Sequence, residues 1–160
     1  MPGLAVRWGE FAEKAPALAA RGLALLYGFG PTVPGLAFLA TTRADGGPRL
    51  HPVCPGIHES GLYVFVVGHS PKRADLDRDG RYALHPFPGQ DDDESFYCTG
   101  PAREVRDAEV RRVVEASFLS QVRPDEVLFE LLLERVLHTR WENPRTPQLK
   151  PVYTRWSATA

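Results

Sequence analysis

The chain has 160 residues, enough to bury one full hydrophobic core and too few for two domains of ordinary size, so a single domain over residues 1–160 is expected. Hydrophobic residues make up 43% of the sequence and charged residues 24%, which excludes a disordered chain. The net charge of −1 provides no large positive field, so no nucleic-acid partner and no membrane-surface partner are predicted.

The N-terminal part predicts one helix followed by a β-hairpin. Residues 8–27 carry leucines and Phe11 among alanines, a composition that favours a helix, and Pro16 predicts a break or kink within it. Residues 36–42 (LAFLATT) and 49–53 (RLHPV) flank the turn sequence RADGGP. Two short apolar runs on either side of such a turn are typical of a hairpin.

The next segment predicts a strand that leads directly into a short helix. After a turn region at residues 54–61 (CPGIHESG), the run LYVFVV at 62–67 is rich in aromatic and β-branched residues and is expected to be the third strand. In PKRADLDRDG, residues 71–80, proline stands at a suitable first helical position and glycine at the end, with Ser70 placed to cap the helix.

The second half predicts two further strands and a helix. Residues 81–87 (RYALHPF) and 95–105 (SFYCTGPAREV) read as strands separated by the polar loop PGQDDDE. Asp107 is expected to cap a helix from Ala108 to about Leu119, because its valines fall on one helical face.

Residues 127–141 (VLFELLLERVLHTRW) are ambiguous between helix and strand. Leucine and glutamate favour a helix by propensity, whereas the apolar residues alternate as they would in a strand. Across the whole chain, strands joined by tight turns indicate an antiparallel sheet that closes into a barrel or stacks as a sandwich. A parallel dinucleotide-binding sheet is disfavoured, and neither GxGxxG nor GxxxxGK[ST] occurs.

Ser70 and the two cations that follow it form a candidate anion site. A helix N-terminus attracts anions through its free N–H groups and its dipole, whereas Lys72 in the first turn is unfavourable unless an anion offsets it. A phosphate monoester suits a hydroxyl and an ammonium, and a guanidinium such as that of Arg73 can add a bidentate contact. The alternative is that Ser70 only caps the helix and that the cations pair with the nearby aspartates, which are Asp75, Asp77 and Asp79.

Together, the hairpin FLATTRADGGPRLHPV and the later stretch LYVFVVGHSPKRADLDRDGRYALH resemble the pyridoxamine 5′-phosphate oxidase-like, FMN-binding split-barrel family. The resemblance covers residues 36–106. It implies a mainly β (α+β) fold, a six-stranded antiparallel Greek-key split β-barrel with peripheral helices, in which the C-terminal strands complete the barrel. It also implies a homodimer with FMN at the interface, and a flavin-dependent oxidoreductase acting on an unknown small-molecule substrate.

The same resemblance implies which residues contact the cofactor. Arg49 should reach the phosphate or the ribityl chain, Ser70 and Lys72 should hold the phosphate, and the backbone around His51 should lie along the isoalloxazine ring. Pro71 separates Ser70 from the basic pair, a departure from the family pattern that leaves the contact of Arg73 in question. The predicted cofactor-binding set is Arg49, Leu50, His51, Pro52, Val53, Val67, Gly68, Ser70, Lys72 and Arg73.

The chemistry beyond cofactor binding stays open at this point. Nothing matches the Arg-x-His pair with which authentic pyridoxamine phosphate oxidases hold their substrate, so that activity is not predicted and no catalytic residue is named. The alternatives are an F420-dependent reductase of the same fold and a non-enzymatic protein that binds flavin, haem or bilin. Trp141 or Trp156 could complete the site of the other subunit, although a packing role is favoured.

No metal site is predicted. His51, Cys54 and His58 are close in sequence, but strand residues three apart point to opposite faces and no fourth ligand is evident. The acidic run at residues 91–94 is expected to be a solvated loop. His85 ends a strand, where it either faces the flavin cavity or is an ordinary strand-end histidine.

The cellular context follows from what the sequence lacks. No apolar run approaches the roughly 20 residues of a membrane span, and the N-terminus lacks the pattern of a signal peptide. Two cysteines, Cys54 and Cys98, give no disulfide framework and are expected to be reduced. A cytoplasmic location is therefore expected.

Overall fold

The computed structural model describes residues 3–89 and 93–159, and within them the chain forms nine strands and four helices. The helices are α1 (Trp8–Lys14), α2 (Pro16–Leu26), α3 (Pro71–Arg78) and α4 (Ala108–Ser117). The strands are β1 (Ala37–Thr42), β2 (Pro48–Val53), β3 (Gly56–His58), β4 (Gly61–Val67), β5 (Arg81–Pro86), β6 (Glu94–Glu104), β7 (Glu126–Leu131), β8 (Arg135–Glu142) and β9 (Lys150–Ser157).

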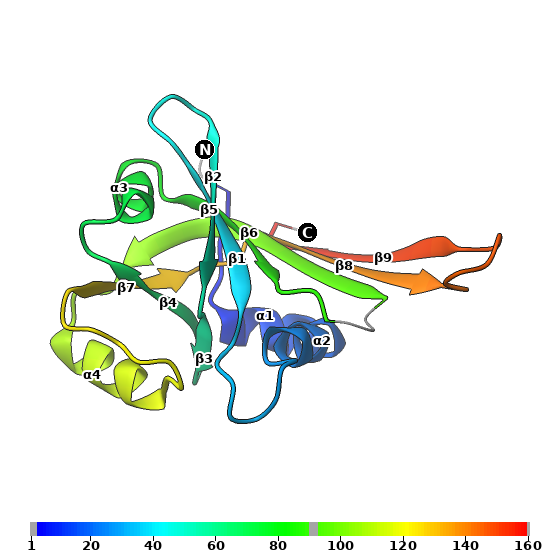
Figure 1. The fold of residues 1–160 in the computed structure, drawn as a ribbon, viewed down its shortest axis with the longest axis horizontal. Coiled ribbons are helices and arrows are strands. Elements are labelled where there is room, and N and C mark those ends of the chain that lie inside the picture. Colours follow the sequence, from blue (N-terminus) through cyan, green and yellow to red (C-terminus); the bar gives the residue numbers. More distant parts are fainter. Residues whose placement is uncertain (1–2, 90–92, 160) are drawn as a thin grey trace.

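All strand pairs are antiparallel, and the sheet curls into an open barrel (Figure 1). The strand order is β2-β1-β5-β6-β7-β4-β3, while β8 pairs with β6 and with β9. The β8–β9 hairpin extends from the body as a long arm (Figure 1). The predicted antiparallel barrel with peripheral helices is confirmed, but the number of six strands is wrong.

The missed strands have two physical origins. Residues 54–61 were expected to be a turn region, yet β3 lies within them, because the left-handed conformation of Glu59 turns the chain tightly enough for Gly56 to pair with Tyr63. The ambiguous segment 127–141 contributes to both β7 and β8. Its leucines are a strand signal here because β7 is buried on both faces, a context that overrides helix propensity.

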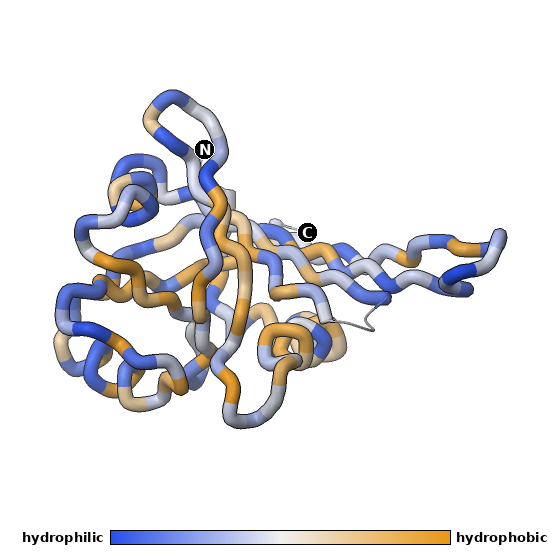
Figure 2. Tube along the Cα trace, in the orientation of Figure 1, coloured by the Kyte–Doolittle hydropathy of each residue, from blue (hydrophilic) through white to orange (hydrophobic). Residues whose placement is uncertain are grey.

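Two hydrophobic clusters fill the two sides of β7. The larger lies inside the barrel, where α1 and α2 pack and the ring of Phe11 lies 4.9 Å from that of Trp156. The smaller joins Val114 of α4 to Leu128 of β7. Figure 2 shows hydrophobic segments along the central strands and in α2. The predicted break near Pro16 is confirmed, since α1 ends at Lys14 and α2 begins at Pro16.

A buried carboxylate fixes the entry of the N-terminal segment. Glu130 of β7 is only 3% exposed and accepts hydrogen bonds from Arg7 at 2.6 Å and from Arg103 at 2.6 Å. Arg7 also donates to Ser60 and Tyr63, so one side chain joins the segment before α1 to β4 and β7. These ion pairs and hydrogen bonds offset the free-energy cost of removing the Glu130 carboxylate from water.

No helix in the described ranges combines the length and the apolar character that a membrane crossing requires.

Strand β6 changes partners along its length, and Gly100 stands at the change. Residues before it pair with β5 and β8, while Ala102 to Glu104 pair with β7. A Cβ atom at Gly100 would collide with the backbone carbonyl of Leu132, which leaves no flexible group that could move aside. Glycine is therefore required where the long strand bends between the two halves of the barrel.

We expect Gly100→Ala to lower the free energy of unfolding by about 1–3 kcal/mol, because the added methyl group overpacks against backbone. Urea unfolding followed by circular dichroism measures the change. Gly47→Ala is the matched control, since a Cβ there would meet only the side chains of Asp45 and Arg43. Equal stabilities of the two variants would contradict this account of the bend.

Candidate functional site

Strand β2, strand β4 and the N-terminus of α3 meet at one corner of the barrel. The chain leaves β4 after Val67 and turns at Ser70, whose Oγ accepts a hydrogen bond from the backbone N–H of Arg73 at 3.3 Å. The predicted N-cap and the proline at the first helical position are both confirmed. On β2 the side chains alternate, so Arg49, His51 and Val53 are more buried than their neighbours.

A cavity of about 200 Å³ opens at this corner. Four predicted cofactor-binding residues line it, which are Pro52, Val53, Val67 and Lys72. Other lining residues were not part of the prediction, namely Cys54, Phe65, Ser120, Gln121, Val122 and Glu126. The fold therefore brings the end of the hairpin and the start of the helix to a shared space, as the resemblance implies.

Lys72 has no hydrogen-bond or ion-pair partner within residues 3–89 and 93–159. Burial lowers the pKa of its ammonium group, and the carboxylate of Glu126 acts in the opposite direction. The Nε2 atom of His51 is also buried without a partner. Burial lowers the pKa of His51, and the charges of Lys72 and Arg49 lower it further, so its imidazole is neutral at pH 7.

Arg49 is held from behind by a buried carboxylate. Its Nε donates to Oδ2 of Asp75 at 2.7 Å, and Asp75 is 3% exposed. The hydroxyl of Thr41 donates to the same oxygen at 2.8 Å, and Arg78 donates to Oδ1 at 3.0 Å. Burial alone would raise the pKa of Asp75, but these three hydrogen bonds outweigh it and lower the pKa to about 2.

Two of the predicted residues are placed differently from the rest. Arg73 pairs with Asp77 at 2.6 Å and with Glu104 at 3.7 Å, and it donates to the carbonyl of Gly68. The alternative considered from the sequence was that both cations pair with nearby aspartates. It is correct for Arg73, whereas Lys72 forms no ion pair in the described ranges. The side chain of Leu50 is 64% exposed, on the opposite side of β2 from Arg49.

Sequence reasoning missed Asp75 and Thr41 as parts of this corner. It treated the three aspartates at residues 75, 77 and 79 as equivalent, although Asp75 is the buried one, next to the buried Leu76. A usable signal was present in the hairpin, because the register set by the turn places Thr41 opposite Arg49. A threonine facing an arginine on the buried side of a hairpin requires a polar partner.

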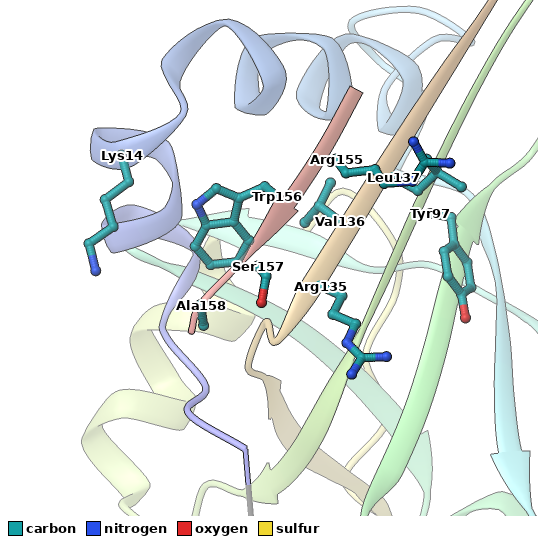
Figure 3. A pocket seen from close by; sticks show the side chains of 9 residues that line it. All are labelled: Lys14, Tyr97, Arg135, Val136, Leu137, Arg155, Trp156, Ser157 and Ala158. Carbon is teal, nitrogen blue, oxygen red and sulfur yellow. The ribbon is translucent and has the colours of Figure 1, made fainter. Parts of the chain in front are cut away.

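A larger cavity, about 710 Å³, lies elsewhere, and none of the ten predicted residues lines it. It spans the outer face and the edge of the β8–β9 hairpin (Figure 3). Tyr97, Leu137 and Arg155 form one row across β6, β8 and β9 on the outer face. Trp156 points toward the core side, as its contact with Phe11 shows. A groove of about 400 Å³ next to it shares Tyr97 as a lining residue.

The structure describes only part of the acidic run at residues 91–94. Asp91 and Asp92 of the acidic run lie outside the described residues. Glu94, at the end of that run, accepts from His138 at 2.9 Å and pairs with Arg21. In residues 3–89 and 93–159, no group of three or more His, Cys, Asp or Glu side chains is arranged to hold a metal ion.

Comparisons with known proteins identify the fold. No family model matches the sequence, and no curated protein matches it. A pyridoxamine 5′-phosphate oxidase-related, FMN-binding protein from Nostoc punctiforme superimposes with a TM-score of 0.57 at 13% identity, over 91% of this chain and 94% of that one.

Two haem proteins also share the fold. A haem-binding protein from Mycobacterium smegmatis has a TM-score of 0.58 at 17% identity over 81% of this chain, which spans only 55% of that longer protein. The haem storage protein HutZ from Vibrio cholerae has a TM-score of 0.51 at 18% identity, over 62% of this chain and 81% of that one. The chain therefore has the split-barrel fold of the pyridoxamine 5′-phosphate oxidase-like proteins.

The depressed pKa of Asp75 predicts a pH-dependent contribution to stability. Its carboxylate contributes about 2 kcal/mol that is present above pH 4 and is lost as the pH falls through about 2. Urea unfolding of the native protein and of Asp75→Asn at pH 5 and pH 2.5 measures this contribution. The difference between the two proteins should shrink at the lower pH, and an equal difference at both values would contradict the buried ion pair.

Proposed function

We propose that the chain is an FMN-binding protein of the pyridoxamine 5′-phosphate oxidase-like family and acts as a flavin-dependent oxidoreductase on a small organic substrate. The observation that carries the proposal is the corner where Lys72 lines a cavity and, together with Arg49, lies near His51, with Ser70 capping the helix that carries Lys72. The Nε2 atom of His51 is buried without a partner in the described ranges, an arrangement that is costly in a protein that binds nothing there. The shared fold supports the same assignment.

The donor set fits the phosphate of FMN. Lys72 forms no ion pair in the described ranges, although the carboxylate of Glu126 lines the same cavity. The Ser70 hydroxyl can still donate because its oxygen only accepts from Arg73. Arg49 directs its Nε at Asp75, which leaves its two terminal nitrogens for an anion. Charge-assisted contacts of this kind are the strong ones in phosphate recognition.

The apolar part of the corner fits the flavin ring. Pro52 and Val53 at the end of β2 and Val67 at the end of β4 line the cavity with Phe65 nearby. FMN, when bound, supplies the hydride chemistry, while these residues orient the ring and keep water from one side of it. No residue of the described chain is assigned as a general acid or base.

We further propose that a second copy of the chain completes the site. A cavity of about 200 Å³ is smaller than the roughly 300–1,000 Å³ of pockets that enclose drug-sized ligands, so one subunit does not surround a flavin. The outer face of β6, β8 and β9 carries no helix in the part of the chain that the structure describes (Figure 1). Its exposed aromatic side chains are Tyr97, Trp141 and Tyr153.

This outer face suits a second copy better than it suits solvent. Tyr97 is 39% exposed. The row of residues next to it consists of Arg135 and four small side chains, which allow close sheet packing. Those small side chains are Ala40, Ala83, Thr99 and Ser157. Aromatic residues together with arginine are enriched at protein interfaces. The interface also explains why the larger cavity lies here and not at the corner.

Haem is the second candidate cofactor, on the evidence of His51. Its imidazole is neutral at pH 7, half-buried, and has an Nε2 atom without a partner, which are the properties of an axial ligand. Arg49 and Lys72 would then face the propionates. F420 in place of FMN remains an alternative outcome of the same cofactor test. Both cysteines are unpaired, which supports the proposed cytoplasmic location.

The test is cofactor retention by the purified protein and by Lys72→Ala. The native protein should bind FMN with a two-band flavin spectrum, and the variant should bind it about 10- to 150-fold more weakly, because one charge-assisted contact of about 1.5–3 kcal/mol is lost. Equilibrium titration with FMN measures both.

Arg73→Ala is the matched control, because Asp77 and Glu104 already engage that neighbouring cation, and a much smaller loss is expected. A single intense haem band that disappears in His51→Ala would assign the second candidate instead. Equal FMN affinity of the native protein and Lys72→Ala would contradict the placement of the phosphate.

A separate prediction concerns the interface. Tyr97→Glu places a charge at the centre of the outer face, so we expect it to convert a dimer to a monomer and to reduce FMN retention at the same time. Light scattering coupled to size-exclusion chromatography gives the mass. Leu119→Glu, an equally apolar and 57% exposed position after α4, should stay dimeric. A native monomer that retains FMN would refute the shared site.

A further inference from the structure

The carboxylate of Asp75 occupies an unusual place for an anion-binding corner. It is buried, and it accepts a hydrogen bond from Arg49 of β2, one of the cations at the corner. Charge alone makes this arrangement unfavourable, because a carboxylate near the site repels the phosphate that the cations attract. Its presence therefore requires a geometric reason.

The contacts of Asp75 supply that reason. Thr41 on β1, Arg49 on β2 and Arg78 on α3 all donate to it, at 2.8, 2.7 and 3.0 Å. Every side-chain hydrogen bond that Arg49 makes in the described ranges is its Nε bond to this carboxylate. An arginine side chain has several freely rotating bonds, and holding Nε at a fixed oxygen removes most of that freedom.

We propose that Asp75 is a positioning residue that pre-organises Arg49, so that both terminal nitrogens of the guanidinium face a phosphate in the corner. The inference deepens the proposed function and rests on it, because the phosphate is taken to be that of FMN. The cost of ordering Arg49 is met when the protein folds and not when the cofactor binds, which raises affinity. Thr41 and Arg78 hold the carboxylate in turn.

The sign of one substitution separates positioning from simple electrostatics. Asp75→Asn removes a negative charge next to the site, so electrostatics alone predicts tighter FMN binding. Positioning predicts the opposite, a weakening on the order of tenfold, because Arg49 loses its fixed acceptor. Asp79→Asn is the matched control: it removes the same charge from the end of the same helix but breaks a pair with Arg81, and its FMN affinity should stay within about threefold.

A double-mutant cycle identifies the residue through which Asp75 acts. In an Arg49→Ala background, Asp75→Asn should cause no further loss of FMN affinity, because the group that it positions is already absent. Additive losses would overturn the proposal, and so would tighter or unchanged binding by Asp75→Asn alone. If Asp75→Asn fails to fold, Arg49→Lys replaces it: lysine keeps the charge but cannot contact a carboxylate and a phosphate in a fixed fork, so the same tenfold weakening is expected.

A measurement without cofactor keeps this inference distinguishable from the proposed function. In the cofactor-free protein the Nε–H of Arg49 should give a slowly exchanging nuclear magnetic resonance signal that is absent in Arg49→Ala and lost in Asp75→Asn. If the native protein shows this signal but binds no FMN, the proposed function is refuted, and so is the role of Asp75 in FMN binding. The fixed position of Arg49 against Asp75 would still be supported. Rapid exchange of the signal in the native protein would refute the positioning itself.

Discussion

The buried carboxylate of Asp75 is the interaction on which the corner of the barrel depends. Strand β2 pairs only with β1, so the sheet by itself does not fix where β2 lies relative to α3. One side chain of the helix closes this gap by accepting from Thr41 on β1 and Arg49 on β2. A buried carboxylate must find such partners or lose its charge, and here it finds three. The hairpin and the helix are therefore held in one arrangement.

This arrangement concentrates charge in a molecule that has almost none overall. The net charge is −1, and most cations of the chain are engaged, as Arg73 is by Asp77. At the corner, Lys72 lines a cavity next to apolar side chains, and the terminal nitrogens of Arg49 make no hydrogen bond within the described ranges. Such a site attracts one anionic group over a short range, in keeping with a cofactor that has a phosphate at one end and an aromatic ring system at the other.

Two buried carboxylates, those of Glu130 and Asp75, each hold an arginine side chain in place. Glu130 binds the segment before α1 to the sheet through Arg7, far from the cavity at the corner, while Asp75 holds an arginine of the proposed site. Both accept hydrogen bonds from two arginines, and Asp75 also accepts one from Thr41, but the arginines differ in their other contacts. The terminal nitrogens of Arg7 donate to Ser60 and Tyr63, whereas the terminal nitrogens of Arg49 have no partner in the described ranges. That difference separates a structural ion pair from a binding one.

The sequence by itself determined the local elements, because caps, breaks and hairpin turns depend on neighbours in the chain: Pro16 ends one helix and starts another, and Ser70 caps α3. It also brought Arg49 and Lys72 into one hypothesis through the family resemblance. Only the tertiary structure decided that segment 127–141 forms strands, since burial on both faces overrides helix propensity. It alone decided that Asp75 faces inward and that Lys72, not Arg73, forms no hydrogen bond or ion pair within residues 3–89 and 93–159. Those outcomes depend on which strand packs beside the helix, and spacing along a single chain does not contain that information.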